Sequence, residues 1–232
     1  ISISLGAVLS LNAHAGVIKT DIVMIVDESG SMGTVQANLR TNIGLFASIL
    51  SAGGIDASYA LVGYGRSGDL FRTLTDFTDP SGFATAAAGL VASGGTEPAY
   101  DAVAYGLNSY AGEASSFSFR NDAVKNLIIF TDEPHNGTST TFDDTDDLLT
   151  ANNALFNAVL RNSSTIASIG PLATNNGGAV FDLNLMNTND QQVVENFVAD
   201  FANAKLQETI DFCVVNPTDP ACINVDPDPN KP

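Results

Sequence analysis

The chain has few basic residues. Nine Lys and Arg stand against 26 Asp and Glu, which gives a formal net charge of −17 over 232 residues. A chain this acidic repels phosphate backbones and anionic membranes, so we expect no nucleic-acid partner. Most of its carboxylates belong to a solvated acidic surface, and only a few can be site residues.

Long apolar segments are also lacking. The opening run, Ile1 to Leu11, is apolar and uncharged but too short to span a bilayer, and no later segment could span one. It leads into Ala13-His14-Ala15, which has the small residues of a cleavage site. Residues 1–15 therefore resemble the back half of a secretory signal peptide without its charged front, and an extra strand or helix is the alternative. We expect a secreted, periplasmic or cell-surface protein.

Cysteine is scarce as well, with Cys213 and Cys222 as its only occurrences. Both lie in a Pro-rich stretch, and the two prolines between them favour a small disulfide loop in an oxidising compartment. Free thiols or a bridge to another chain are the alternatives. We expect residues 16–211 to form the folded domain, since 44% apolar residues can build a sizeable core, and residues 212–232 to form a tail.

Between these ends, short apolar runs alternate with amphipathic stretches, which predicts strands and helices in turn. The predicted parallel strands are 22–26, 59–64, 127–130, 164–169 and 179–185, and an antiparallel one is 70–77. The predicted helices are 35–50, 83–91, one that Thr96 caps, one that Asp143–Asp147 opens and that carries Leu148, Leu155 and Val159, and one from about Asp190 to Gln207. This order indicates an α/β fold, doubly wound around a mostly parallel sheet, with one antiparallel edge strand and helices on both faces.

Oxygen-bearing side chains follow several of these strands. Asp27, Ser29 and Ser31 come after the first strand, Thr96 lies in a loop before a helix, and Asp132 follows 127–130. Ligands of open α/β sheets bind beyond the carboxyl ends of the strands, and oxygen is the ligand atom that Mg²⁺ prefers. Taken singly, each residue could instead cap a helix or close an Asx turn.

Three motifs together resemble the metal-ion-dependent adhesion site of the von Willebrand factor A domain family, which includes the integrin inserted domain. They are Asp27-Glu-Ser29-Gly-Ser31-Met32, Gly94-Gly95-Thr96 and Phe130-Thr131-Asp132, and the resemblance spans about Lys19 to Leu206. It implies one bound Mg²⁺, or Mn²⁺ or Ca²⁺. It implies that hydroxyls of Ser29, Ser31 and Thr96 coordinate the ion, with Asp27 and Asp132 doing so directly or through water. An acidic residue of a partner protein would complete the shell.

One departure from the family is Glu133, which follows Asp132 where the family usually has Gly. Glu28, Glu97, Glu133 and His135 are candidates for contact with the partner. We therefore expect an exported, non-catalytic adhesion module. An accessory subunit of an ATPase or chelatase assembly is one alternative, and a metal-dependent hydrolase is another, although the sequence indicates no nucleophile or base for it.

Overall fold

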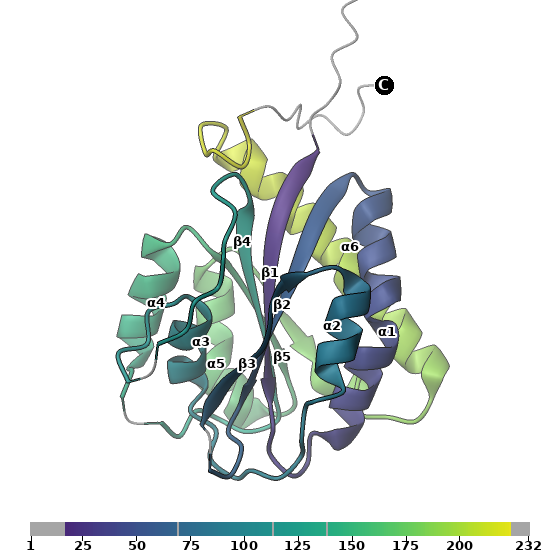
Figure 1. The fold of residues 1–232 in the computed structure, drawn as a ribbon, viewed down its shortest axis with the longest axis vertical. Helices are drawn as coiled ribbons and strands as arrows, with labels where there is room; N and C mark the ends of the chain where they lie inside the picture. Colours follow the sequence, from purple (N-terminus) through teal and green to yellow (C-terminus); the bar gives the residue numbers. More distant parts are fainter. Residues whose placement is uncertain (1–16, 69, 113, 138, 224–232) are drawn as a thin grey trace, which may run out of the picture.

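The structure, a computed structural model, describes residues 17–223 except 69, 113 and 138. The predicted signal segment, 1–15, lies outside the described residues. Within them, six strands form one sheet in the order β3-β2-β1-β4-β5-β6, and every neighbouring pair is parallel except β2 with β3 (Figure 1). The predicted fold class is confirmed, with β3 as the antiparallel edge strand.

The central strands are buried on both faces, as expected where helices cover a parallel sheet. In β1, every residue except Lys19 is buried, and in β4 every residue except Lys125 is. The strands are β1 (Ile18–Asp27), β2 (Ile55–Tyr64), β3 (Phe71–Thr78), β4 (Val124–Thr131), β5 (Leu155–Leu160) and β6 (Val180–Asp182).

Helices pack on both faces of the sheet, and side chains of β1 alternate between the two cores. Met24 and Val26 join the core under α1, α2 and α6, whereas Val23 and Ile25 join the core under α3, α4 and α5 (Figure 1). The helices are α1 (Gly33–Ala52), α2 (Pro80–Ala87), α3 (Ala99–Gly106), α4 (Phe142–Ala151), α5 (Ser163–Asn175) and α6 (Gln191–Val215), with a 3₁₀ turn η1 (Leu183–Leu185).

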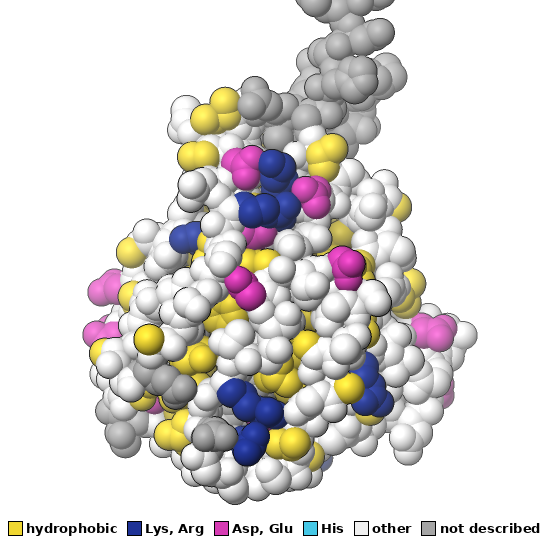
Figure 2. Space-filling view, viewed as in Figure 1, with side chains coloured by type: hydrophobic (Ala, Val, Ile, Leu, Met, Phe, Trp, Pro, Cys, Tyr) yellow, Lys and Arg dark blue, Asp and Glu magenta, His cyan; other side chains and the backbone are white. Residues whose placement is uncertain are grey.

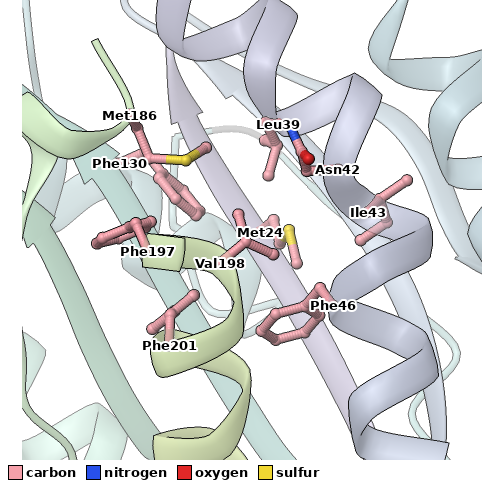
Figure 3. Close-up of a pocket in the computed structure, with 10 residues that line it drawn as sticks. All are labelled: Met24, Leu39, Asn42, Ile43, Phe46, Phe130, Met186, Phe197, Val198 and Phe201. Carbon is pink, nitrogen blue, oxygen red and sulfur yellow. The ribbon is translucent and has the colours of Figure 1, made fainter. Parts of the chain in front are cut away.

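The longest two helices, α1 and α6, meet over the sheet around a small apolar pocket. Phe46 of α1 lies 5.5 Å, centroid to centroid, from Phe201 of α6, and Met24 of β1 and Phe130 of β4 also line the pocket (Figure 3). Asn42 of α1 is the polar exception among the lining residues, and its amide donates to Asn38 O within the same helix.

The segment after α4 corrects one prediction. Leu155 and Val159 were predicted to continue that helix, but α4 ends at Ala151 and both residues lie in β5. Asn153 has φ of 49°, a left-handed conformation that Asn tolerates and that ends a helix. The helix-like spacing of Leu148, Leu155 and Val159 arose because α4 and a fully buried strand follow one another directly.

The predicted strand 164–169 is wrong, because those residues form the first half of α5. The side chain of Asn162 accepts hydrogen bonds from the backbone N–H of Ser164 and Thr165, which caps that helix. Of the predicted strand 179–185, only β6 is extended, and η1 follows it. The last helix extends past Gln207 to Val215 and so enters the predicted tail.

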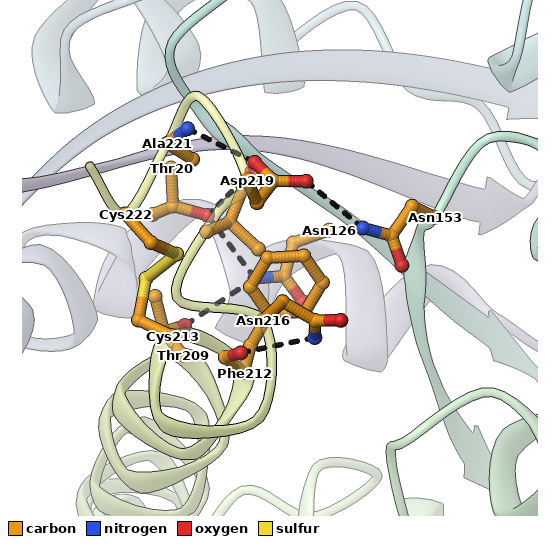
Figure 4. Close-up of a disulfide and its surroundings, with 11 residues drawn as sticks. Thr20, Asn126, Asn153, Thr209, Phe212, Cys213, Asn216, Asp219, Ala221 and Cys222 are labelled. Carbon is orange, nitrogen blue, oxygen red and sulfur yellow. Dashed lines mark hydrogen bonds between the residues drawn. A yellow bond between two sulfur atoms is a disulfide. The ribbon is translucent and has the colours of Figure 1, made fainter.

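The two edges of the sheet differ in what they carry. The Cys213–Cys222 disulfide is present and lies at the edge where β1 begins (Figure 4). At the opposite edge, two of the three motifs follow the ends of β1 and β4, and the third, in the loop between α2 and α3, pairs with the first through Ser29 and Gly94. Lys and Arg side chains form small separate groups on the face that Figure 2 shows. None of the helices within the described residues is long and apolar enough to cross a membrane.

Candidate metal centre

The first motif forms a tight loop between β1 and α1. Asp27 ends β1 and is fully buried; its Oδ1 accepts a hydrogen bond of 2.6 Å from the backbone N–H of Ser29. The hydroxyls of Ser29 and Ser31 lie 3.3 Å apart. The carboxylate and the two hydroxyls at alternate positions of the motif thus lie close to one another.

A second loop, around Gly94, packs backbone to backbone against the first. Gly30 N–H donates to Gly94 O at 3.2 Å, and Gly94 N–H donates to Glu28 O at 2.9 Å. A Cβ at Gly94 would lie 1.7 Å from Gly65 O, so only glycine permits this approach. A Cβ at Gly65 would lie 2.6 Å from Thr96 O and 3.6 Å from Asp27 Oδ1, so Gly65 lies close to both the Thr96 backbone and the Asp27 carboxylate.

Thr96 is exposed and does not cap α3, contrary to the predicted helix start. That helix begins at Ala99 after Pro98, and Pro98 makes no side-chain cap. His135 supplies the missing acceptor, because its Nδ1 accepts a hydrogen bond of 3.1 Å from Tyr100 N–H. The Thr96 side chain therefore has no part in capping α3.

The third motif completes the group from β4. Thr131 Oγ1 donates to Asp27 Oδ2 at 2.8 Å, which ties β4 to the end of β1. The next residue, Asp132, is 4% exposed; its Oδ2 accepts from Arg161 Nη1 at 2.8 Å, and its Oδ1 is buried with no hydrogen-bond partner. The Asp132 backbone carbonyl also accepts from Asn162 and Thr165 at the start of α5.

Burial and mutual repulsion disfavour the ionised forms of the carboxyls here. Burial raises the pKa of Asp27 to about 6; the Ser29 and Thr131 hydrogen bonds oppose this rise, and the charge of Asp132 adds to it. Burial likewise raises the pKa of Glu97 to about 7, with further contributions from the charges of Asp27 and Glu133. Glu97 accepts from Asn136 Nδ2 at 2.8 Å through one oxygen, while its other oxygen, Oε1, has no partner.

Three neighbours of this group were missed by the sequence analysis: Thr131, Arg161 and Tyr64. The position of Thr131 beside Asp132 was the one available signal. Arg161 follows β5, a strand that had been predicted as helix, so nothing pointed to it. Tyr64 ends β2 opposite Asp27 in the sheet register, and its buried hydroxyl has no hydrogen-bond partner. Burial, together with the charge of Asp27, raises the pKa of that hydroxyl well above its usual value.

Two of the predicted partner-contact residues have structural contacts instead. Glu28 is fully buried, pairs with Arg72 through both carboxylate oxygens, and accepts from Val91 N–H. His135 is half-buried, and its ring stacks on Tyr100 with centroids 3.8 Å apart. Burial also lowers the pKa of His135, in keeping with an Nδ1 that accepts a hydrogen bond.

The donor set suits a hard divalent cation. Asp132 Oδ1 and Glu97 Oε1 are two of the three buried carboxylate oxygens without a hydrogen-bond partner in the described part of the chain, Asp101 Oδ1 being the third, and such atoms are rare in folded proteins. A cation would relieve the electrostatic repulsion around Asp27, and the oxygens of the serine hydroxyls could coordinate it. Among the residues that the structure describes, no three Asp, Glu, His or Cys side chains form a group that could hold a metal ion by themselves.

Comparison with known protein families gives one match. A profile of the von Willebrand factor type A domain matches residues 21–209, which include all three motifs and every strand apart from the start of β1. A comparison with curated proteins gave no match.

Proposed function

The chain belongs to the von Willebrand factor type A domain family, and we propose that it is an exported adhesion module that binds an acidic partner through one divalent cation. Domains of this family generally mediate protein–protein interaction, often with a metal, and are typically not enzymes. The cation is Mg²⁺, or Mn²⁺ or Ca²⁺. The residues that would hold it are Asp27, Ser29, Ser31, Thr96 and Asp132.

The observation that carries this proposal is the unpartnered Oδ1 of Asp132. Arg161 occupies the other oxygen of the same carboxylate, so the side chain is held with one oxygen uncommitted. Leaving a buried acceptor unpaired costs about 1–3 kcal/mol, which a bound cation would recover. The hydroxyls of Ser29 and Ser31 supply neutral oxygens nearby.

A bound divalent cation would supply an open coordination position for a carboxylate of the partner. Ser29, Ser31 and Thr96 are neutral, and Arg161 pairs with Asp132, which offsets part of the negative charge that Asp27 and Glu97 bring to the site. This matters in a chain with a net charge of −17, which otherwise repels acidic proteins.

Of the four predicted partner contacts, Glu133 fits that role best. Its side chain is exposed and follows Asp132 directly. Glu97 is buried beside Asp27, so it fits a role near the cation better than contact with a partner. Glu28 and His135 are left out, since both have structural contacts. The disulfide between Cys213 and Cys222 supports export, because disulfides persist in oxidising compartments.

The test is a titration of Mg²⁺, Mn²⁺ and Ca²⁺ into the metal-free protein while thermal unfolding is followed. An ion that binds only the folded state raises the melting temperature by mass action. At an ion concentration 100 times the Kd, it adds about 2.7 kcal/mol to the free energy of unfolding. We expect a rise that a chelator reverses and that Asp27→Ala abolishes.

Asp200→Ala is the matched control. Asp200 is an exposed carboxylate on α6, so its loss removes the same charge away from the motifs. The control should keep the full rise in melting temperature. A wild-type protein without a chelator-sensitive rise, or an Asp27→Ala variant that keeps it, would show that the site does not bind metal.

A further inference from the structure

A buried cluster of polar side chains joins α6 to the sheet at the edge opposite the candidate metal centre. Lys205 of α6 is fully buried, and its Nζ donates to Asn126 Oδ1 of β4 at 2.5 Å and to Glu208 Oε2 at 2.7 Å. Glu208 Oε2 also accepts from Asn157 Nδ2 of β5 at 2.9 Å. The Lys205 amine thus contacts both the primary amide of Asn126 and the carboxylate of Glu208.

The amide of Asn126 is held in a fixed orientation. Its Nδ2 donates to Thr20 Oγ1 at 3.1 Å and to Thr209 Oγ1 at 3.4 Å, close to the Cys213–Cys222 disulfide (Figure 4). Asn126, Thr20 and Thr209 are each at most 1% exposed. The carbonyl carbon of the amide, one bond from the Oδ1 that Lys205 contacts, is therefore both immobilised and shielded from bulk water.

Burial makes the neutral, nucleophilic form of the amine easier to reach than in water. Burial lowers the pKa of Lys205, an effect that the charge of Glu208 opposes. Glu208 can accept a proton from Nζ across their hydrogen bond, which is how a carboxylate activates an amine. Because the fold holds the amine against the amide, their reaction is unimolecular. For well-oriented groups within one molecule, the effective molarity can reach about 10⁵ M or more, which speeds the reaction accordingly.

We propose that Lys205 and Asn126 react to form an intramolecular isopeptide bond. The Lys205 Nζ–Asn126 Cγ bond forms, the Asn126 Cγ–Nδ2 bond breaks, and one ammonia leaves. Glu208 takes one proton from Nζ, and Nδ2 gains one proton as it leaves as ammonia, so the step balances without an oxidant, reductant or co-reactant. The reaction does not depend on the candidate metal centre, which lies at the opposite edge of the sheet.

The cross-link joins β4 to α6 across 79 positions of sequence. The disulfide closes the end of the same helix, so α6 is held covalently at two neighbouring points. Reducing agents open the disulfide and leave the isopeptide bond intact.

Mass spectrometry of the intact, folded chain tests the proposal. After reduction, we expect a mass below that of the sequence by one ammonia, and a digest in which the peptides that contain Lys205 and Asn126 are linked. A mass equal to that of the sequence would overturn the proposal. So would an ammonia loss confined to a single peptide, as a succinimide at Asn136-Gly137 or Asn176-Gly177 produces.

Two variants separate the chemistry from folding. Lys205→Arg keeps a cation but removes the amine, and Glu208→Gln keeps the size of the side chain but removes the base. Both should fold, as judged by circular dichroism, and both should have the mass of their sequence. A linked peptide in Glu208→Gln would overturn the role given to Glu208.

Discussion

At the scale of single residues, the Asp27 side chain makes several contacts at once. It ends β1, caps the turn to Ser29, accepts from Thr131 of β4, and lies close enough to Asp132 and Glu97 for their charges to repel. Its ionised form is therefore stabilised by hydrogen bonds but penalised by burial and by its neighbours. A bound cation reverses that balance, because it favours the ionised form.

The titration of Asp27 gives the first prediction in the metal-free protein. Folding raises the pKa of Asp27 from 3.8 to about 6 and that of Glu97 from 4.5 to about 7. The folded state then holds protons that the unfolded chain has released, so this contribution is largest at acid pH and is lost as the pH rises. From about pH 4 to about pH 7 we expect a loss on the order of 2 kcal/mol from Asp27, measured by urea unfolding in chelator.

Asp27→Asn is the control for this pH dependence, since an amide does not ionise. The variant should show a shallower fall in the free energy of unfolding over the same range. Saturating Mg²⁺ should also reduce the fall in the wild type, because the cation binds ionised carboxylates. Equal slopes in wild type and variant would contradict the assignment to Asp27.

At the scale of elements, the candidate centre is made by loops that leave neighbouring strands. The loops after β1 and β2 and the loop around Gly94 contact one another through backbone atoms, and the end of β4 is tied in by Thr131. Such contacts leave no room for a side chain at Gly65 or Gly94. The close approach of the loops therefore explains why glycine occupies these two positions. The strands position the loops, and the glycines allow them to meet.

Gly94→Ala should damage this arrangement. The added Cβ would lie 1.7 Å from Gly65 O, and backbone cannot move aside as a side-chain tip can. We expect a loss of about 1–3 kcal/mol in the free energy of unfolding and a smaller Mg²⁺-induced rise in melting temperature. Urea unfolding and the metal titration measure the two effects.

Gly95→Ala is the matched control, since nothing lies within 4 Å of a Cβ at that position. Its stability should stay within about 0.5 kcal/mol of the wild type. If the two alanine variants behaved alike, the close approach of the loops would not be what Gly94 provides.

At the scale of the whole molecule, the candidate metal centre and the groups that stabilise α6 lie at opposite ends of the sheet. The carboxyl ends of β1 and β4 and the loop around Gly94 bring the three motifs together, while the other edge carries the disulfide (Figure 4) and the polar cluster of Lys205. Between them lies a core that the helices cover on both faces. Changes at one edge should therefore affect stability without altering binding at the other.

Removal of the disulfide tests this separation. Cys213→Ser with Cys222→Ser opens a loop of nine positions, and chain entropy predicts a loss of about 2–3 kcal/mol in the free energy of unfolding. The Mg²⁺-induced rise in melting temperature should keep its wild-type size. A variant that lost that rise while still folded would show that the two edges are coupled.

The sequence by itself determined the fold class and the three motifs. Runs such as 22–26 are too apolar to be anything but buried, and residues that follow strands of a parallel sheet must come to one edge. Local spacing could not separate α4 from β5, because the apolar residues of the two elements happen to recur at helical spacing and only residues 152–154 lie between them.

Only the tertiary structure decided which side chains have committed contacts. Glu28 and Asp27 are neighbours in sequence, yet Glu28 pairs with Arg72 whereas Asp27 meets the motifs, because alternate residues of an extended chain point to opposite faces. Arg161 reaches Asp132 across 29 positions and Lys205 reaches Asn126 across 79. Such contacts depend on how strands and helices pack, and no local pattern of residues encodes them.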